Sequence, residues 1–266
     1  KHDFIQTPGL ERLAKLGSRF TAAYAPTPTC TGSRISIQLG MTPARTQYRN
    51  VFDVLSHYQR PDGYDDETTL GEMFKDSGQN YITAMFGKGA SALGRFEDAG
   101  YDVTDELPGE PGGNGNGHGS YWDVKKKTPF PADNPKRMRS LRKDSVAFVN
   151  KYAGEQPFFL MVSHYAAHIP HLATKEAFER NKKRWIEEGR DTKDIDVEKS
   201  SVHRNVIYAA MIEEMDMNVG ALIDVLDDKE ELDNTYIIFT SDNGGGHSRR
   251  EKVDGENRRF NGPLQE

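Results

Sequence analysis

Short apolar runs alternate along the chain with longer segments of helical periodicity, and this alternation constrains the fold more than any other feature. Strands that alternate with helices of this length predict an α/β fold with a largely parallel sheet. The expected strands are Arg19–Ala25, Tyr81–Phe86, Pro157–Val162 and Asn234–Thr240. The expected helices are Thr7–Leu16, Ser33–Leu39, Thr68–Ser77, Pro135–Tyr152 and Val202–Leu226. The continuous apolar runs Phe158–Val162 and Tyr236–Phe239 are typical of central strands that are covered on both faces.

Three other segments carry a recognisable pattern. Apolar residues at four- and three-residue spacing in the last helix predict a core-facing stripe rather than a ligand groove. These residues are Met211, Met215, Val219, Leu222 and Leu226. The glycine-rich stretch Gly109–Gly119 predicts a surface loop that borders a site. The highly charged stretch Lys175–Lys199 predicts a solvated helical insertion or lid.

Composition and charge exclude several classes of protein. Lys and Arg number 35 against 41 Asp and Glu, for a net charge of -6. Because this charge is spread along the chain and no basic stripe occurs, we expect no nucleic-acid partner. No apolar run approaches the roughly 20 residues that a membrane-spanning helix needs, so we expect no membrane segment. The single cysteine, Cys30, excludes an internal disulfide.

Polar residues follow the expected strands at the points where each strand ends. Cys30 and Arg34 follow the first, Lys88 the second, a histidine-containing stretch the third, and Asp242-Asn243 the last. Ligands of open α/β sheets bind at the carboxyl ends of the strands. We therefore expect these side chains to lie on one rim of the sheet.

Each of these residues also has a structural interpretation when taken alone. Asp242 and Asn243 offer oxygen ligands for Ca²⁺ or Mg²⁺, but Asp-Asn-Gly-Gly is also an ordinary turn sequence. Cys30 precedes a helix, where backbone N–H groups favour an anion, but it could equally be a buried structural thiol. Arg34 and Lys88 could be surface or salt-bridge residues.

Three histidines occur within eight residues, at His164, His168 and His171. His164 and His168 have helical spacing, yet no Glu stands where a zinc protease needs one. Pro170 also argues against a helix there. The histidines therefore do not predict a zinc site.

The order of these motifs resembles that of the type I sulfatases of the alkaline phosphatase superfamily. The most specific part is Cys30-Thr31-Gly32-Ser33-Arg34 followed by Gly40-Met41-Thr42-Pro43-Ala44-Arg45. Ser241-Asp242-Asn243-Gly244, Asn261-Gly262-Pro263-Leu264 and the helix opened by Thr7-Pro8-Gly9-Leu10 support it. The resemblance runs along nearly the whole chain. It implies an alkaline phosphatase-like fold with a largely parallel or mixed sheet and helices on both faces.

The resemblance also implies roles for single residues. Cys30 would be oxidised by a maturation enzyme, formylglycine-generating or anaerobic, to formylglycine, whose hydrated aldehyde is the nucleophile. Arg34 would hold this gem-diol, while Lys88 and His168 would bind the sulfate or assist the leaving oxygen. Asp242 and Asn243, together with the modified Cys30, would bind Ca²⁺, with Mg²⁺ as an alternative.

The sequence departs from the family pattern at several positions. Gly32 stands where the family has Pro or Ala, which bears on recognition by the maturation enzyme. Ala90 stands where the family has a histidine two places after the lysine, and His118 is a candidate replacement. His171 is a further candidate for substrate binding.

The family's paired aspartates precede the Thr-Pro helix, and a further lysine follows the Asn-Gly-Pro-Leu segment. By this pattern, the two aspartates and the lysine fall outside residues 1–266. We therefore expect residues 1–266 to be the central part of a sulfatase catalytic domain and to have little activity alone.

The predicted function is hydrolysis of a sulfate ester, with a sulfated small molecule or glycan, most reasonably a sulfated carbohydrate, as substrate. Two alternatives remain at this point. One is a phosphoester or phosphonate hydrolase of the same superfamily, and the other is a non-catalytic protein that binds sulfated glycans. A periplasmic or secreted location is expected from the resemblance alone.

Overall fold

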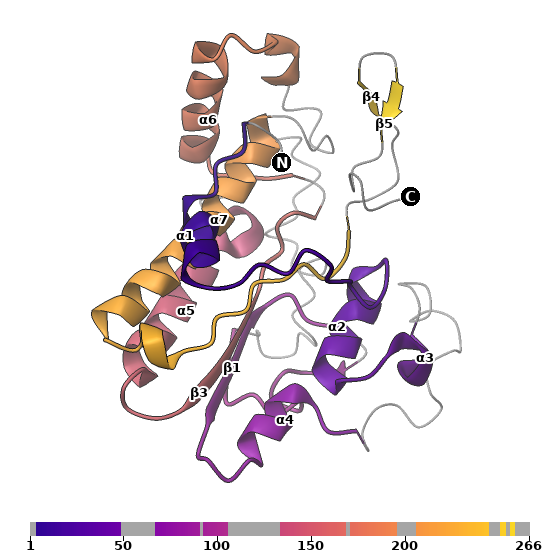
Figure 1. Ribbon diagram of the computed structural model, residues 1–266, viewed down its shortest axis with the longest axis vertical. Coiled ribbons are helices and arrows are strands. Elements are labelled where there is room, and N and C mark those ends of the chain that lie inside the picture. Colours follow the sequence, from indigo (N-terminus) through magenta and orange to yellow (C-terminus); the bar gives the residue numbers. More distant parts are fainter. Residues whose placement is uncertain are drawn as a thin grey trace. The chain divides into compact units, whose positions relative to one another are not determined.

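The computed structural model describes residues 4–48, 67–90, 93–105, 134–168, 171–195, 206–244, 251–253 and 256–258 (Figure 1). Two compact units are present. The first comprises Lys1–Phe20 with Leu70–Tyr236, and the second comprises Thr21–Thr69 with Ile237–Glu266.

A three-stranded parallel sheet forms the centre of the first unit. The strands are β1 (Ile82–Gly87), β2 (Val103–Thr104) and β3 (Phe158–Ser163), in the order β2-β1-β3. β1 pairs with β3 from Ile82↔Phe158 to Gly87↔Ser163. The structure thus confirms the two strands expected at Tyr81–Phe86 and Pro157–Val162. The two-residue strand β2 was not predicted, because a strand this short has no periodic signal.

Five α-helices and three short 3-10 helices complete the described part of the first unit. The α-helices are α1 (Pro8–Leu16), α4 (Leu70–Lys75), α5 (Met138–Tyr152), α6 (Lys175–Glu187) and α7 (Val206–Asp228). The 3-10 helices are η5 (Pro135–Arg137), η6 (Thr192–Ile195) and η8 (Leu232–Asn234).

Helices cover both faces of the sheet. Successive residues of a strand point to opposite faces. Phe159 of β3 stacks on Phe74 of α4, with ring centroids 4.2 Å apart. Its neighbour Phe158 meets Phe148 of α5 edge-on, at 5.9 Å. The prediction of a parallel sheet with helices on both faces is therefore confirmed.

Helix α7 is the centre of the helical layer, and α1, α5 and α6 pack against it (Figure 1). Met211, Met215, Val219 and Leu226 are buried, which confirms the predicted core stripe. The charged stretch that starts at Lys175 begins with a helix, as expected, but α6 packs against α7 and is not solvated on all sides. One face of α6 is buried, including Phe178 and Trp185.

The N-terminus of α1 is capped from α7 rather than by its own Thr7. The Asp216 carboxylate accepts hydrogen bonds from the backbone N–H groups of Gly9 (2.7 Å) and Leu10 (2.8 Å). A Cβ at Gly9 would lie 2.5 Å from the Asp216 carbonyl oxygen and 2.9 Å from the Gly220 nitrogen. The glycine therefore permits the close approach of the two helices.

The second unit contains α2 (Cys30–Leu39), the short helix α3 (Pro43–Thr46) and the antiparallel pair β4 (Glu251–Val253) and β5 (Glu256–Arg258). Helix α2 begins at Cys30, three residues before its predicted start. It ends at Leu39 and is capped by Gly40, whose φ of 61° gives the left-handed conformation expected of a C-terminal glycine.

Two strand predictions are wrong in this structure. Arg19–Ala25 and Asn234–Thr240 form no β-pairing within the described residues. A run of apolar residues becomes a strand only when a neighbouring strand takes up its backbone hydrogen bonds. The expected burial is also missing, since Tyr236 is 100% exposed and Ile238 87%.

Within the described residues, no helix has the length and apolar character needed to cross a membrane.

Candidate active site

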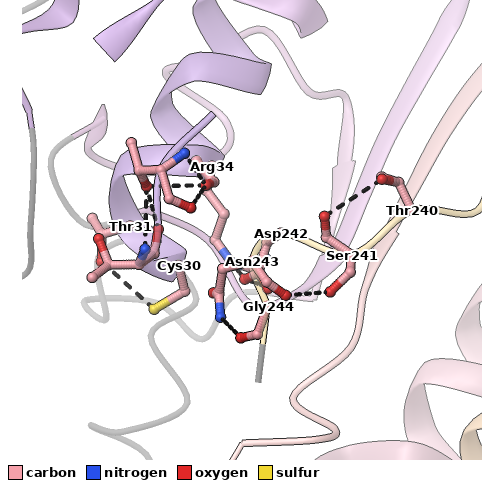
Figure 2. Close-up of polar contacts among 11 residues, drawn as sticks. Cys30, Thr31, Arg34, Thr240, Ser241, Asp242, Asn243 and Gly244 are labelled. Atoms are coloured by element: carbon pink, nitrogen blue, oxygen red, sulfur yellow. Dashed lines mark hydrogen bonds and ion pairs between the residues drawn. The ribbon is translucent and has the colours of Figure 1, made fainter. Parts of the chain in front are cut away.

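One group of predicted residues lies in the second unit, around the first two turns of α2. Cys30 is the first residue of the helix, and Arg34, four residues later, lies on the same face. Figure 2 shows these two residues with Asp242 and Asn243, which follow the extended segment that ends at Thr240. We call Cys30, Arg34, Asp242 and Asn243 the α2 cluster.

An ion pair joins the two halves of the α2 cluster. Arg34 Nη2 lies 2.7 Å from Asp242 Oδ2, and Arg34 Nε donates to the same oxygen at 2.9 Å (Figure 2). Both side chains are largely buried, at 11% and 23% exposure. Charge-assisted hydrogen bonds of this kind fix orientation as well as position. The pair therefore ties the Asp242-Asn243 turn to the helix that carries Cys30.

The turn itself is held by local hydrogen bonds. Ser241 Oγ donates to the Asn243 carbonyl oxygen at 2.7 Å, and Asn243 Nδ2 donates to the Gly244 carbonyl oxygen at 2.7 Å. The oxygens of Asp242 and Asn243 suit a hard cation such as Ca²⁺ in type. Among the described residues, however, no three His, Cys, Asp or Glu side chains gather where they could hold a metal ion. The described part of the chain therefore supplies only a fraction of a coordination sphere.

Cys30 is a free, partly exposed cysteine at a helix N-terminus. Its Sγ lies 4.0 Å from Thr31 Oγ1, and Thr29 does not cap the helix with its side chain. The N-terminal N–H groups of a helix attract negative charge. The location therefore suits a nucleophile that handles an anionic group.

Gly32, the position at which the sequence departs from the family pattern, lies against Thr27. A Cβ there would come within 2.9 Å of Thr27 Oγ1, 3.0 Å of Thr27 Cγ2 and 3.1 Å of the Tyr48 carbonyl oxygen. Thr27 is itself held by Ser33, whose Oγ lies 3.0 Å from Thr27 Oγ1. The departure at Gly32 thus has a packing explanation in this chain.

A second group of residues lies in the first unit, where β1, β2 and β3 end. Gly87, the last residue of β1, has a φ of +96°, and a Cβ there would lie 2.1 Å from the Ser163 carbonyl oxygen. Lys88 follows it and is buried, at 7% exposure, and its backbone N–H donates to the same carbonyl at 2.8 Å. The close contact between Gly87 and Ser163 fixes the backbone conformation next to Lys88.

Helix η5 contributes two further basic residues to this strand end, Lys136 and Arg137. Arg137 Nη2 lies 2.7 Å from Asp105 Oδ2 in a buried ion pair, and Asp105 Oδ1 accepts the Gly87 N–H at 3.0 Å. Burial raises the pKa of Asp105, while Arg137 and the Gly87 hydrogen bond oppose this shift. The neighbouring Lys136 is 1% exposed, and its Nζ donates to the His168 carbonyl oxygen at 2.8 Å.

We call the residues of this strand end the strand-end cluster. Its members are Gly87, Lys88, Asp105, Lys136, Arg137 and His168. Burial, followed by repulsion from Lys88, lowers the pKa of Lys136 to about 6.

The three candidate histidines have different locations. The His168 side chain is exposed, in the loop after β3, where a substrate could reach it. His171 is fully buried, and its ring lies 4.9 Å from that of Tyr208 in α7. The ring is thus not exposed to solvent in this structure, and contact of His171 with substrate stays a prediction. His118 lies outside the described residues.

Sequence reasoning missed Asp105, Lys136 and Arg137. The helix expected at Pro135–Tyr152 includes Lys136 and Arg137 but assigns them no function, and no expected element includes Asp105. Nothing local marks a lysine in a polar stretch as buried. Lys88, by contrast, was identified from its place after a strand.

Comparison with known proteins supports the motif interpretation. The Sulfatase family model matches residues 2–265. The human N-acetylgalactosamine-6-sulfatase is 25% identical over 267 residues, covering 90% of this chain and 45% of that protein. The choline-sulfatase of Rhizobium meliloti (strain 1021) is 27% identical over 289 residues, covering 91% and 53%. The chain thus spans about half the length of the curated relatives that it matches.

Solved structures confirm the fold. The phosphonate monoester hydrolase of Agrobacterium radiobacter aligns with a TM-score of 0.57 at 15% identity, covering 87% of this chain and 56% of that one. Solved structures of sulfatases align comparably, so the fold is alkaline phosphatase-like. Because a phosphonate hydrolase shares it, the fold alone does not separate sulfate from phosphonate chemistry. The match of the family model over nearly the whole chain does assign the family: the chain belongs to the sulfatases.

Proposed function

We propose that the protein hydrolyses sulfate esters, with Cys30 as the precursor of the nucleophile. The observation that carries this proposal is the α2 cluster, in which Cys30 opens a helix and Arg34, one turn later, is paired with Asp242 at 2.7 Å. Cys30 and Arg34 open the stretch, continued by Gly40-Met41-Thr42-Pro43-Ala44-Arg45, on which the resemblance to the family most depends.

Cys30 requires modification before it can take this role. Conversion of its CH₂–SH group to an aldehyde consumes one water and releases hydrogen sulfide, two protons and two electrons. A maturation enzyme with an external two-electron oxidant would carry out this step. The hydrated aldehyde supplies one oxygen that attacks sulfur and a second hydroxyl whose deprotonation then expels sulfate. A serine could perform only the first step and would remain as a stable sulfate ester.

The residues around Cys30 suit this chemistry electrostatically. Negative charge develops on the transferred group, and the N-terminus of α2 offers partial positive charge at Cys30. Arg34, already oriented by Asp242, would hold the oxygens of the modified residue.

Lys88 and His168 of the strand-end cluster would bind the sulfate and assist the leaving oxygen. The crowded backbone at Gly87 fixes the position from which Lys88 extends, while His168 is exposed in a loop. An imidazole can protonate a departing alkoxide, which matters most when the leaving alcohol is a poor leaving group.

The family generally uses a divalent cation as well as formylglycine. We propose Ca²⁺, or else Mg²⁺, with Asp242 and Asn243 among its ligands because their oxygens match a hard cation. The described residues alone supply too few ligands to complete such a site.

We propose a sulfated carbohydrate as the substrate class. The support is the human relative, which is named for a sulfated amino sugar. The relative named for choline sulfate shows that the family also includes proteins named for other substrates.

The test is turnover by the protein expressed from its complete gene together with a maturation enzyme. We expect sulfate release from an aryl sulfate and from sulfated monosaccharides, and a loss of roughly 10³-fold or more in Cys30→Ala. Cys30→Ser should retain a sulfate ester after one turnover, detectable by mass spectrometry. Faster turnover of aryl phosphates or phosphonates than of aryl sulfates would contradict the proposal.

A further inference from the structure

We propose that Lys136 is a positioning residue within the strand-end cluster. It would hold in place the described part of the loop after β3, residues 164–168, which we call the His168 loop. The inference rests on the proposed function, because it takes His168 as a group that assists the leaving oxygen. Lys136 itself would not touch the substrate and would act through the backbone of His168.

The contact that carries the inference joins a buried side chain to an exposed loop residue. Lys136 Nζ donates to the His168 carbonyl oxygen at 2.8 Å, and the Lys136 side chain is 1% exposed. His168 lies five residues beyond the last residue of β3, and its own N–H closes a turn on the Tyr165 carbonyl oxygen at 3.0 Å. The lysine thus ties an exposed loop to the interior.

The anchor is itself rigidly held. Lys136 and Arg137 both have left-handed backbone conformations, with φ of 56° and 53°. Side chains other than glycine adopt this conformation at a cost, and such strain is concentrated at functional sites. The buried pair of Arg137 with Asp105, which also accepts the Gly87 N–H, fixes η5 to the end of β1. Lys136 therefore links the His168 loop to the strand that precedes Lys88.

A lysine is a costly residue for this location. Burial of an amine disfavours its charged form, and Lys88 repels that form further. An apolar side chain of similar length would avoid both costs. The Lys136 amine provides a hydrogen-bond donor for the His168 carbonyl oxygen. An apolar side chain could not provide this donor.

The test uses the dependence of rate on the leaving group. If His168 assists the leaving oxygen, displacing it slows substrates with poor leaving groups more than those with good ones. For Lys136→Met we expect kcat on a sulfated monosaccharide to fall by about 10- to 100-fold. We expect kcat on 4-nitrophenyl sulfate to fall by less than about threefold, since a good leaving group needs little assistance. His168→Ala should give the same selective pattern.

A double substitution tests whether Lys136 acts through His168. In the His168→Ala background, Lys136→Met should have little further effect on kcat, because residues that act as a unit are not additive. Lys136→Gln keeps an N–H donor and should therefore lose less kcat than Lys136→Met. It also replaces Lys136→Met in the test if the methionine variant folds poorly. Lys143→Met, at an exposed position of α5, is the matched control for loss of a lysine and should leave both rates unchanged.

The outcomes separate the two claims. Equal losses on both substrates, or additive effects of Lys136→Met and His168→Ala, would overturn the role of Lys136 and leave the proposed function intact. Failure of the unsubstituted, matured protein to release sulfate from either substrate would overturn the proposed function and this inference with it.

Discussion

This chain has glycine at position 32, where the family has Pro or Ala. Replacing Gly32 by alanine tests whether packing explains this difference. In a helix interior, alanine is favoured over glycine by roughly 0.5–1 kcal/mol, so an open site would be stabilised. The structure predicts the opposite sign. The new Cβ would meet Thr27 Oγ1 at 2.9 Å, Thr27 Cγ2 at 3.0 Å and the Tyr48 carbonyl oxygen at 3.1 Å.

The magnitude follows from how far these neighbours can move. Thr27 is 6% exposed, its Oγ1 donates to the Thr29 carbonyl at 2.7 Å, and Ser33 Oγ lies 3.0 Å away. Overpacking of a closed site costs typically 1–3 kcal/mol, which exceeds the gain in helix propensity. We therefore expect Gly32→Ala to lower the free energy of unfolding by about 1–2 kcal/mol, or roughly 2–8 °C in Tm.

The assay is thermal and urea unfolding of four proteins: unsubstituted, Gly32→Ala, Thr27→Ala and the double variant. Thr27→Ala removes both side-chain atoms that crowd the new Cβ. The double variant should therefore be about 1 kcal/mol more stable than the sum of the two single effects predicts. A Gly32→Ala protein that is as stable as the unsubstituted one, or more so, would refute the packing argument. Additive effects in the double variant would show that Thr27 is not the cause.

Three further predictions concern the first unit. The pKa of Lys136 is about 6 in the folded protein and near 10.4 in unfolded chains, so the unfolded state holds the extra proton between these values. The free energy of unfolding of the unsubstituted protein should therefore rise between about pH 6 and pH 10, by up to about 1.4 kcal/mol per pH unit more than that of Lys136→Met. The same pH dependence of the free energy of unfolding in both proteins, measured by urea unfolding, would disprove this. Gly9→Ala should lower Tm, because its Cβ would lie 2.5 Å from the Asp216 carbonyl oxygen, and an unchanged Tm would show that α1 can move away from α7. Arg137→Met should cost about 3–5 kcal/mol in urea unfolding by leaving the buried Asp105 carboxylate without this partner, and a loss below about 1 kcal/mol would contradict the buried ion pair.

The alternation of apolar runs and helical segments predicted much of the first unit. β1, β3, α5 and α7 lie close to their expected positions, because a buried parallel strand and an amphipathic helix each leave a strong local pattern. The same pattern failed for Asn234–Thr240. Its apolar residues make the segment able to join a β-sheet. Whether it does so depends on a neighbouring strand, and no local sequence pattern specifies that strand.

The candidate site divides in a similar way. Cys30, Arg34 and Asp242 could be named from motifs, and the structure adds that Arg34 and Asp242 form an ion pair. Lys136 could not be named, because its role depends on a partly buried contact with a residue 32 positions away in the sequence. His171 was named from its neighbours His164 and His168, but spacing alone does not distinguish a buried ring from an exposed one.

The central claim is that Cys30 becomes the nucleophile of a sulfatase. Its most direct test is mass spectrometry of the peptide that contains Cys30, from the protein expressed from its complete gene together with a maturation enzyme. We predict that the peptide carries an aldehyde in place of the thiol and that sulfate ester turnover rises in proportion to the converted fraction. An intact thiol in a preparation that turns over sulfate esters, or full conversion without turnover, would contradict the account.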